Sequence, residues 1–173
     1  MTIGVTALHV LSTLLVALLS AMSWGAGETG RIVLPMLPIL AIVYWSGAER
    51  RPMLSSGVFI TGLFADMVFQ APTGHWTLVA LATALFVRAA SRSASIRTPM
   101  RRSVIALAAI PLALASSWCL SFFYTGAPAP VWPYLSALPW LAAAFIPLAA
   151  VLGLADRLVE RAGGERTVLG GGA

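Results

Sequence analysis

Runs of apolar residues separated by short polar segments fill the chain almost from end to end. Six runs stand out, over residues 3–23, 32–47, 53–70, 75–90, 104–124 and 131–155. A helix needs about 20 apolar residues to cross the roughly 30 Å hydrocarbon core of a bilayer, so each run fits one crossing, although the second and fourth are short. The segments between the runs contain the Gly, Pro or charged residues of turns. The pattern predicts an all-α fold, a polytopic membrane bundle of about six transmembrane helices.

These runs predict a single transmembrane domain, residues 1–155, followed by a tail, residues 156–173. The first run resembles a signal peptide in position, but it lacks a preceding basic segment and is long enough for a full crossing, so we expect it to be the first helix. The tail ends in a glycine-rich segment with little apolar surface to bury. We therefore expect the tail to be partly disordered.

Composition supports the membrane assignment. The 173 residues are 59% hydrophobic and 10% charged, whereas soluble domains carry roughly 25% charged residues and cannot hide so much apolar surface in a small core. The single cysteine, Cys119, lies inside an apolar run, so neither a disulfide framework nor a thiolate metal site is predicted. We expect no cofactor and no metal ion, and we do not interpret the basic charge as nucleic-acid binding.

The placement of the arginines predicts the topology. With six crossings, the first, third and fifth connections share one side of the membrane and contain only Arg31. The other side collects the ten remaining arginines: Arg50, Arg51, Arg88, Arg92, Arg97, Arg101, Arg102, Arg157, Arg161 and Arg166. Positively charged connections stay in the cytoplasm, so this split places both termini and the even-numbered connections on the cytoplasmic side.

Five of these arginines form what we call the basic strip. Its members are Arg88, Arg92, Arg97, Arg101 and Arg102. We interpret the basic strip first as the signal that fixes topology. Docking of an acidic cytoplasmic partner or of anionic membrane lipids is the alternative.

Asp66 is the only ionisable residue well inside an apolar run. A charge at the middle of a bilayer costs roughly 2.5–3.5 kcal/mol, so Asp66 requires a partner. Counting about 1.5 Å per residue from Met53 places Asp66 in the outer leaflet, at the level of Arg31. We expect Asp66 to pair with Arg31, and we favour a structural role for the carboxylate over direct recognition of a ligand or partner.

Catalytic patterns are absent from the sequence. We find no Ser-His-Asp or Cys-His set at a common depth, no H-E-x-x-H helix and no phosphate-binding glycine loop. His75 is expected to mark the start of a helix, and His9 is expected to be hydrogen-bonded inside the bundle. We expect Ser116, Ser117 and Ser121 to form hydrogen bonds across helix interfaces. The sequence therefore predicts a protein that is not an enzyme.

One stretch of the chain resembles a known family. Residues 62–66, Gly-Leu-Phe-Ala-Asp, followed by residues 71–74, Ala-Pro-Thr-Gly, resemble the G-L-x-x-D and P-x-G pattern of the rod shape-determining protein MreD family. Upstream, the apolar run 37–43 that ends in Tyr44 and Trp45, with the basic pair Arg50 and Arg51, is also similar to that family. The resemblance covers about residues 35–88.

The resemblance implies a non-enzymatic scaffold in the bacterial inner membrane. Such proteins belong to the cell-wall elongation complex and associate with the bitopic protein MreC, with other membrane proteins of that complex and, directly or through MreC, with the actin-like MreB filament. The residues that the resemblance and the topology mark as structural or partner-binding are Arg31, Tyr44, Trp45, Gly62, Asp66, Pro72 and Gly74.

The same family is similar in fold to the six-helix substrate-binding subunits of energy-coupling-factor vitamin transporters. A substrate-binding subunit for a vitamin or another small molecule is therefore the alternative function. It would require a polar pocket near the outer face, and the outer connections offer little beyond Glu28, Arg31, Thr73 and His75. This scarcity favours the scaffold.

The topology predicts the accessibility of the connection 91–103. After Cys119 is replaced, a cysteine introduced at Ser95 should react with a membrane-impermeant thiol reagent only once the membrane has been permeabilised, because the basic strip keeps this connection in the cytoplasm. Labelling in intact cells measures this directly. Efficient labelling of Ser95→Cys from outside would contradict the proposed orientation.

Overall fold

The chain folds as a bundle of helices. The computed structural model describes residues 3–22, 27–47, 53–93 and 99–169, and these residues form six α-helices and no strand. The helices are α1 (Ile3–Ala21), α2 (Glu28–Ser46), α3 (Ser55–Val68), α4 (His75–Ser93), α5 (Pro99–Thr125) and α6 (Trp132–Leu169). The predicted all-α class is confirmed, and each predicted apolar run contains one helix.

Three of the described helices are long and apolar enough to cross a membrane. The qualifying stretches are Thr29–Ser46 in α2, Val104–Thr125 in α5 and Trp132–Arg157 in α6. Two further helices contain shorter apolar stretches, Thr6–Ala21 in α1 and Ser55–Val68 in α3.

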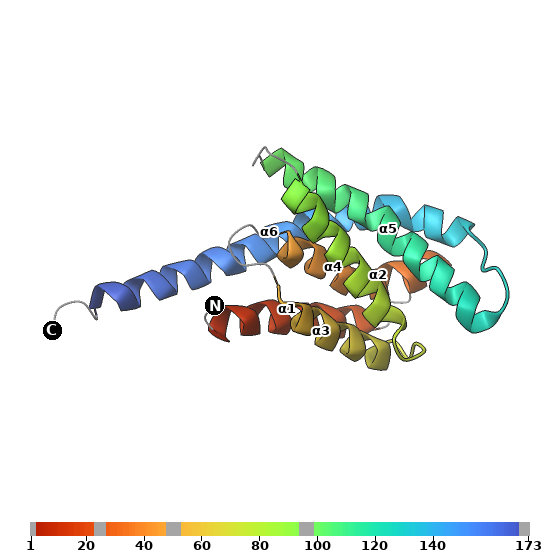
Figure 1. The fold of residues 1–173 in the computed structure, drawn as a ribbon, viewed down its shortest axis with the longest axis horizontal. Coiled ribbons are helices and arrows are strands. Elements are labelled where there is room, and N and C mark those ends of the chain that lie inside the picture. The colour runs from red at the N-terminus through yellow and green to blue at the C-terminus, as the bar shows by residue number, and fades with distance from the viewer. Residues whose placement is uncertain (1–2, 23–26, 48–52, 94–98, 170–173) are drawn as a thin grey trace.

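Four helices extend beyond the boundaries that the apolar runs predicted. Helix α2 begins at Glu28 rather than at residue 32, and α4 ends at Ser93 rather than at residue 90. Helix α5 begins at Pro99 rather than at residue 104; proline is favoured at the first helical position, where its missing N–H is not needed. Helix α6 continues past residue 155 to Leu169, into the tail that we expected to be partly disordered. Figure 1 shows its C-terminal part extending beyond the other helices. Residues 156–162 are mostly good helix formers, which favours the first part of this continuation.

Hydrogen bonds between segments place the ends of the helices. The bonds Thr77–Asp66 and Arg88–Ser55 join opposite ends of α3 and α4, which therefore run antiparallel. The N–H of Met53 donates to the carbonyl of Trp45, which joins the end of α2 to the start of α3. At the opposite end, the hydroxyls of Thr29 on α2 and Ser136 on α6 lie 3.2 Å apart. Figure 1 shows that α1 begins at the end of the bundle where α2 and α4 end and where α3 and α5 begin.

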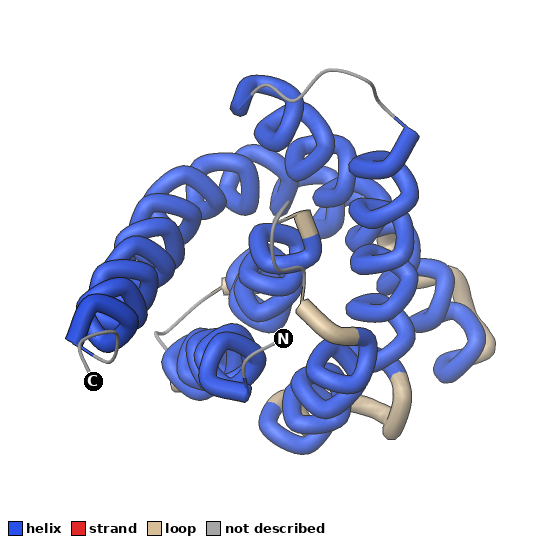
Figure 2. The backbone as a smooth tube through the Cα atoms, turned by 60° about the vertical axis from the view of Figure 1, so that its left-hand side comes forward, coloured by secondary structure: helices blue, strands red, loops and turns tan. Residues whose placement is uncertain are grey.

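Helix α2 occupies the centre of the bundle. It contacts every other described helix, and Figure 2 shows it surrounded by them. Residues 38–43 are all buried, and the largest core side chains include Met36, Ile39, Ile42 and Trp45. A helix that is apolar on all sides must be covered on all sides, and the other helices provide this cover.

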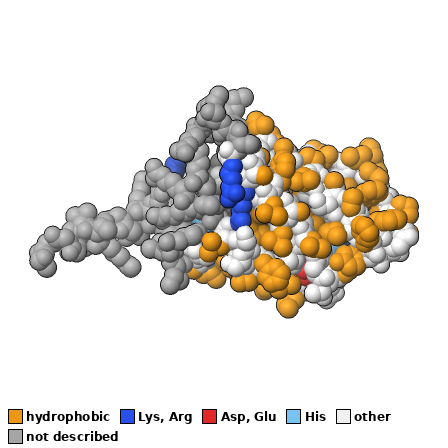
Figure 3. Space-filling model, viewed as in Figure 1, with side chains coloured by type: hydrophobic (Ala, Val, Ile, Leu, Met, Phe, Trp, Pro, Cys, Tyr) orange, Lys and Arg blue, Asp and Glu red, His pale blue; other side chains and the backbone are white. Residues whose placement is uncertain are grey.

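The outer surface of the bundle is also apolar (Figure 3). Large exposed hydrophobic side chains include Leu11 on α1, Phe123 on α5 and Ile146 on α6, which are 63%, 79% and 72% exposed. Soluble proteins rarely expose contiguous apolar patches of this kind. The distribution is compatible with helices that face lipid.

Candidate functional site

Asp66 is buried where α4 begins. Its side chain is 4% exposed. The Oδ1 atom accepts a hydrogen bond from the backbone N–H of Trp76 at 2.6 Å, and Oδ2 accepts bonds from the N–H of Gly74 at 2.9 Å and the hydroxyl of Thr77 at 2.7 Å. The first N–H groups of a helix have no partner within the helix and form its positive end. Asp66 of α3 therefore caps the N-terminus of α4.

A tight turn brings those donors to the carboxylate. The N–H of Ala71 donates to the carbonyl of Asp66 at 3.0 Å, and the N–H of His75 donates to the carbonyl of Pro72, also at 3.0 Å. Gly74 has a φ of +97°, a conformation that side chains other than glycine's rarely permit. Its N–H donates to Asp66, and its positive φ sets the direction in which the chain continues into α4, so Pro72 and Gly74 both serve the cap.

Gly62 is the place where α3 and α4 approach most closely around this site. A Cβ added at residue 62 would lie 2.5 Å from the Cα of Thr77. Only glycine leaves room for Thr77 to approach α3 and reach Asp66, one helical turn away. We call Gly62, Asp66, Gly74, Trp76 and Thr77 the α3–α4 clamp. The structure thus brings together Gly62, Asp66, Pro72 and Gly74, the four site residues that we named from the G-L-x-x-D and P-x-G pattern.

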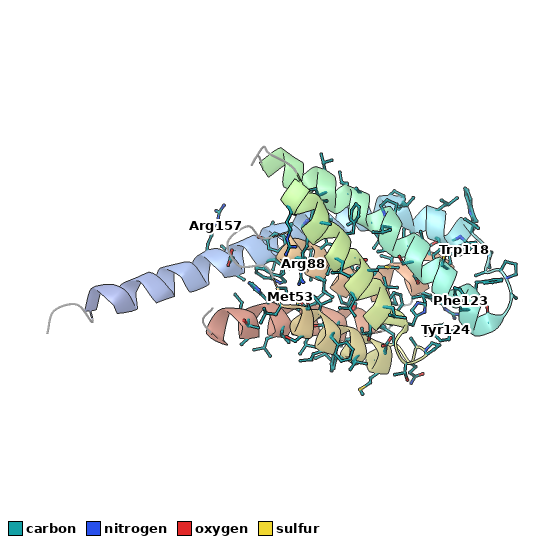
Figure 4. The ribbon with its side chains drawn as sticks, viewed as in Figure 1. Met53, Arg88, Trp118, Phe123, Tyr124 and Arg157 are labelled. Atoms are coloured by element: carbon teal, nitrogen blue, oxygen red, sulfur yellow. The ribbon has the colours of Figure 1, made fainter. Side chains whose placement is uncertain are left out.

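Arg88 joins the same two helices at their other ends. Its Nη1 donates to the hydroxyl of Ser55 at 2.7 Å, and its Nη2 donates to the carbonyl of Met53. Figure 4 shows Arg88 and Met53 together at this end of α3 and α4. The sequence assigned Arg88 only to the basic strip. The signal that distinguishes it is its position inside the apolar run 75–90, whereas the rest of the basic strip lies beyond that run.

The remaining members of the basic strip are not brought together by described contacts. Arg92 is exposed on α4, one helical turn beyond Arg88. Arg97 lies outside the described residues, and Arg101 and Arg102 belong to α5 but their side chains are outside the described part of the structure.

The expected pair between Asp66 and Arg31 is wrong. Arg31 is exposed near the start of α2, and the recorded hydrogen bonds of Asp66 involve only Gly74, Trp76 and Thr77. Both carboxylate oxygens are satisfied inside the α3–α4 clamp, so a cation is not needed to stabilise the buried charge. The expectation of a structural role for Asp66 agrees with this geometry.

Trp45 lies inside the bundle. It is fully buried; its indole N–H donates to Ser12 at 3.1 Å, and its ring stacks on His9 at a centroid distance of 4.1 Å. Tyr44 is partly buried and contacts the edge of Trp45. Its hydroxyl lies against Gly153 of α6, where a Cβ would be 3.1 Å away. The two aromatic residues therefore connect α1, α2 and α6.

Of the three α5 serines that we expected to bond across helix interfaces, two do so. Ser121 shares a hydrogen bond of 3.2 Å with the hydroxyl of Tyr134 on α6, and Ser117 lies 3.0 Å from Nε2 of His75 on α4. Ser116 bonds within its own helix, to the carbonyl of Leu112.

We expected no Ser-His-Asp set at a common depth, yet the structure brings His75 and Ser117 into contact. Both side chains are buried, at 6% and 3% exposed, and the oxygens of Asp66 are occupied by the start of α4. The contact therefore joins α4 to α5 inside the bundle. Within the described part of the chain, no group of three His, Cys, Asp or Glu side chains is placed to hold a metal ion.

The α3–α4 clamp predicts the energetic partner of Asp66. Asp66→Ala should lower the stability of the purified protein in detergent by more than about 2 kcal/mol, since each hydrogen bond to a charged group contributes about 1.5–3 kcal/mol. A double-mutant cycle with Thr77→Val should show a coupling of about 0.5–3 kcal/mol. The matched cycle with Arg31→Leu should be additive; coupling to Arg31 but not to Thr77 would contradict the assignment.

The close approach at Gly62 predicts a steric effect. Gly62→Ala should destabilise the protein by about 1–3 kcal/mol, because the new methyl group would push against the backbone of α4 rather than a flexible side chain. Gly47→Ala is the control, since a Cβ there meets its nearest atoms at 3.4 and 3.5 Å, which is ordinary contact. Denaturation in detergent followed by circular dichroism compares the two. Equal effects would argue against the close approach at Gly62.

Comparisons with known proteins add no relative from which a function could be transferred. No family model, no curated protein and no solved structure matches the chain. The function is therefore argued from the residues of the α3–α4 clamp, from the distribution of charge and from the apolar surface.

Proposed function

We propose that the protein is a scaffold of the MreD type in the bacterial cell-wall elongation complex. The observation that carries this proposal is that Gly62, Asp66, Pro72 and Gly74, which match the pattern of that family, form one structural unit. A chance match of short sequence patterns has no reason to give residues that depend on one another. The α3–α4 clamp gives these residues one shared structural role, which supports the proposal.

We further propose that all six helices cross the bacterial inner membrane, with both termini in the cytoplasm. The antiparallel order of the helices, the apolar outer surface and the three longest apolar helices support this arrangement. Arg88 and Arg157 belong to the end at which the two termini lie, whereas Arg31 is at the start of α2. The positive-inside rule then assigns the end that contains Arg88 and Arg157 to the cytoplasm.

A scaffold accounts for the outer polar residues better than a transporter subunit does. The side chains of Asp66, His75 and Thr77 are bonded within the protein, where they hold α3, α4 and α5 together. A substrate-binding subunit would need such groups to face a ligand. In the proposed scaffold, the exposed apolar faces of α1, α5 and α6 can bind the membrane helices of partners such as an MreC-like bitopic protein. That partner would connect the scaffold to the MreB filament.

Depletion in the native rod-shaped bacterium should produce round or lysing cells, while vitamin uptake remains normal. Cell shape is scored by microscopy, and uptake is measured with a labelled vitamin. Expression of the unchanged protein or of Arg31→Leu should restore rod shape, since Arg31 makes no contact with the α3–α4 clamp, whereas Gly62→Leu should not.

Co-purification from membranes separates the two functions. A bitopic wall-synthesis protein should accompany the scaffold. An ATPase pair in its place, together with normal cell shape and a vitamin requirement after depletion, would reverse the proposal in favour of the transporter subunit.

A further inference from the structure

The proposed cytoplasmic end of α3 and α4 presents two neighbouring arginines. A guanidinium carries five N–H donors, and Arg88 uses donors of Nη1 and Nη2 on Ser55 and Met53. These bonds fix the guanidinium beside the start of α3. Arg92 lies one helical turn further along α4 and is exposed, and no hydrogen bond or ion pair joins it to another described residue. The pair therefore combines a cation held by hydrogen bonds with one that has no partner among the described residues.

Positive charge accumulates here without a described counter-charge on the same two helices. Like charges four residues apart on a helix repel each other. Asp66, the one acidic residue of α3 and α4, is bonded to the N-terminus of α4 at the other end of these helices. The N-cap residue of α3, Leu54, forms no side-chain cap. The unbonded N–H groups at the start of α3 add partial positive charge to that of the arginines.

An exposed apolar surface begins directly beside these charges. Phe59 lies one turn beyond Ser55 on α3, and Leu85 lies one turn before Arg88 on α4; they are 46% and 61% exposed. Leu54, at the start of α3, is 43% exposed. Figure 3 shows arginine atoms at the border between the apolar surface and the part of the chain that is not described.

We propose that Arg88 and Arg92 bind the phosphate of an anionic phospholipid whose acyl chains lie over Leu54, Phe59 and Leu85. Guanidinium groups bind phosphate oxygens with paired, charge-assisted hydrogen bonds. The apolar surface distinguishes a lipid from free phosphate, because only a lipid carries hydrocarbon chains next to its phosphate. Clustered arginines at the cytoplasmic surface recognise anionic lipids in this way. The site rests on the membrane insertion proposed above but not on the role in wall synthesis.

Native mass spectrometry of the full-length protein, released from detergent with added phosphatidylglycerol or phosphatidylcholine, tests the site. The unchanged protein should retain phosphatidylglycerol in preference to phosphatidylcholine. Arg92→Gln should weaken phosphatidylglycerol binding about fivefold, as expected for one arginine near a lipid surface. Arg92→Lys, which keeps the charge, should retain most of the affinity. Arg92 is used for the variants because Arg88 also holds α3 to α4.

Arg157→Gln is the matched control, because Arg157 is also exposed but belongs to α6. It should leave phosphatidylglycerol binding unchanged. Equal retention of the two lipids, or an equal loss in Arg157→Gln and Arg92→Gln, would overturn the site. Displacement of phosphatidylglycerol by inorganic phosphate at the same concentration would identify free phosphate as the ligand and would also overturn it. Because partner co-purification is measured separately, failure of this site leaves the proposed scaffold function to its own test.

Discussion

The carboxylate of Asp66 lies against the first backbone N–H groups of α4, and the arrangement of α3 and α4 depends on this contact. A helix that begins inside an apolar bundle has N–H groups that water cannot reach, and a carboxylate inside the same bundle has a charge that water cannot reach. Placed together, each group satisfies the other. Oδ1 and Oδ2 accept bonds from Gly74, Trp76 and Thr77, so two groups that would each be costly alone are buried together.

This contact also explains the glycines around it. Thr77 can reach Asp66 only if α3 and α4 are nearly in backbone contact, which requires the absence of a side chain at Gly62. At the other end of the same helices, Arg88 repeats the arrangement with the opposite charge, since a guanidinium on α4 bonds to the carbonyl of Met53 and the hydroxyl of Ser55. Helices α3 and α4 are thus tied at both ends. Helix α4 in turn packs against the central helix α2.

Apolar runs predicted the helices, because a membrane requires long uninterrupted stretches of hydrophobic residues. They did not predict where α5 begins or where α6 ends, since these helices continue past the apolar runs into sequence that favours helix for other reasons. The sequence did not predict the burial of Trp45, because an aromatic residue near a helix end can face lipid or the bundle and only the packing of His9 and Ser12 decides.

The sequence likewise predicted only part of the candidate site. The sequence identified Asp66 as a residue that needs a partner, and it identified the pattern of Gly62, Pro72 and Gly74. It suggested Arg31 because side-chain charges are visible in a sequence, whereas the backbone N–H groups at the start of a helix are not distinguished from any others. The sequence predicted that a helix begins at His75, as α4 does, but not that its first N–H groups lie against Asp66, because the turn 69–74 and the close approach at Gly62 set that position.

Amide hydrogen exchange at Gly74 and Trp76, followed by NMR of the protein in micelles, tests this account most directly. The two amides should be protected in the unchanged protein, and Asp66→Ala should accelerate their exchange by at least about tenfold, since a hydrogen bond to a charged group contributes about 1.5–3 kcal/mol. Amides in the middle of α2 serve as the reference for overall unfolding. Exchange at Gly74 and Trp76 that Asp66→Ala does not change, or changes only as much as it changes the reference amides, would contradict the claim that Asp66 holds the start of α4.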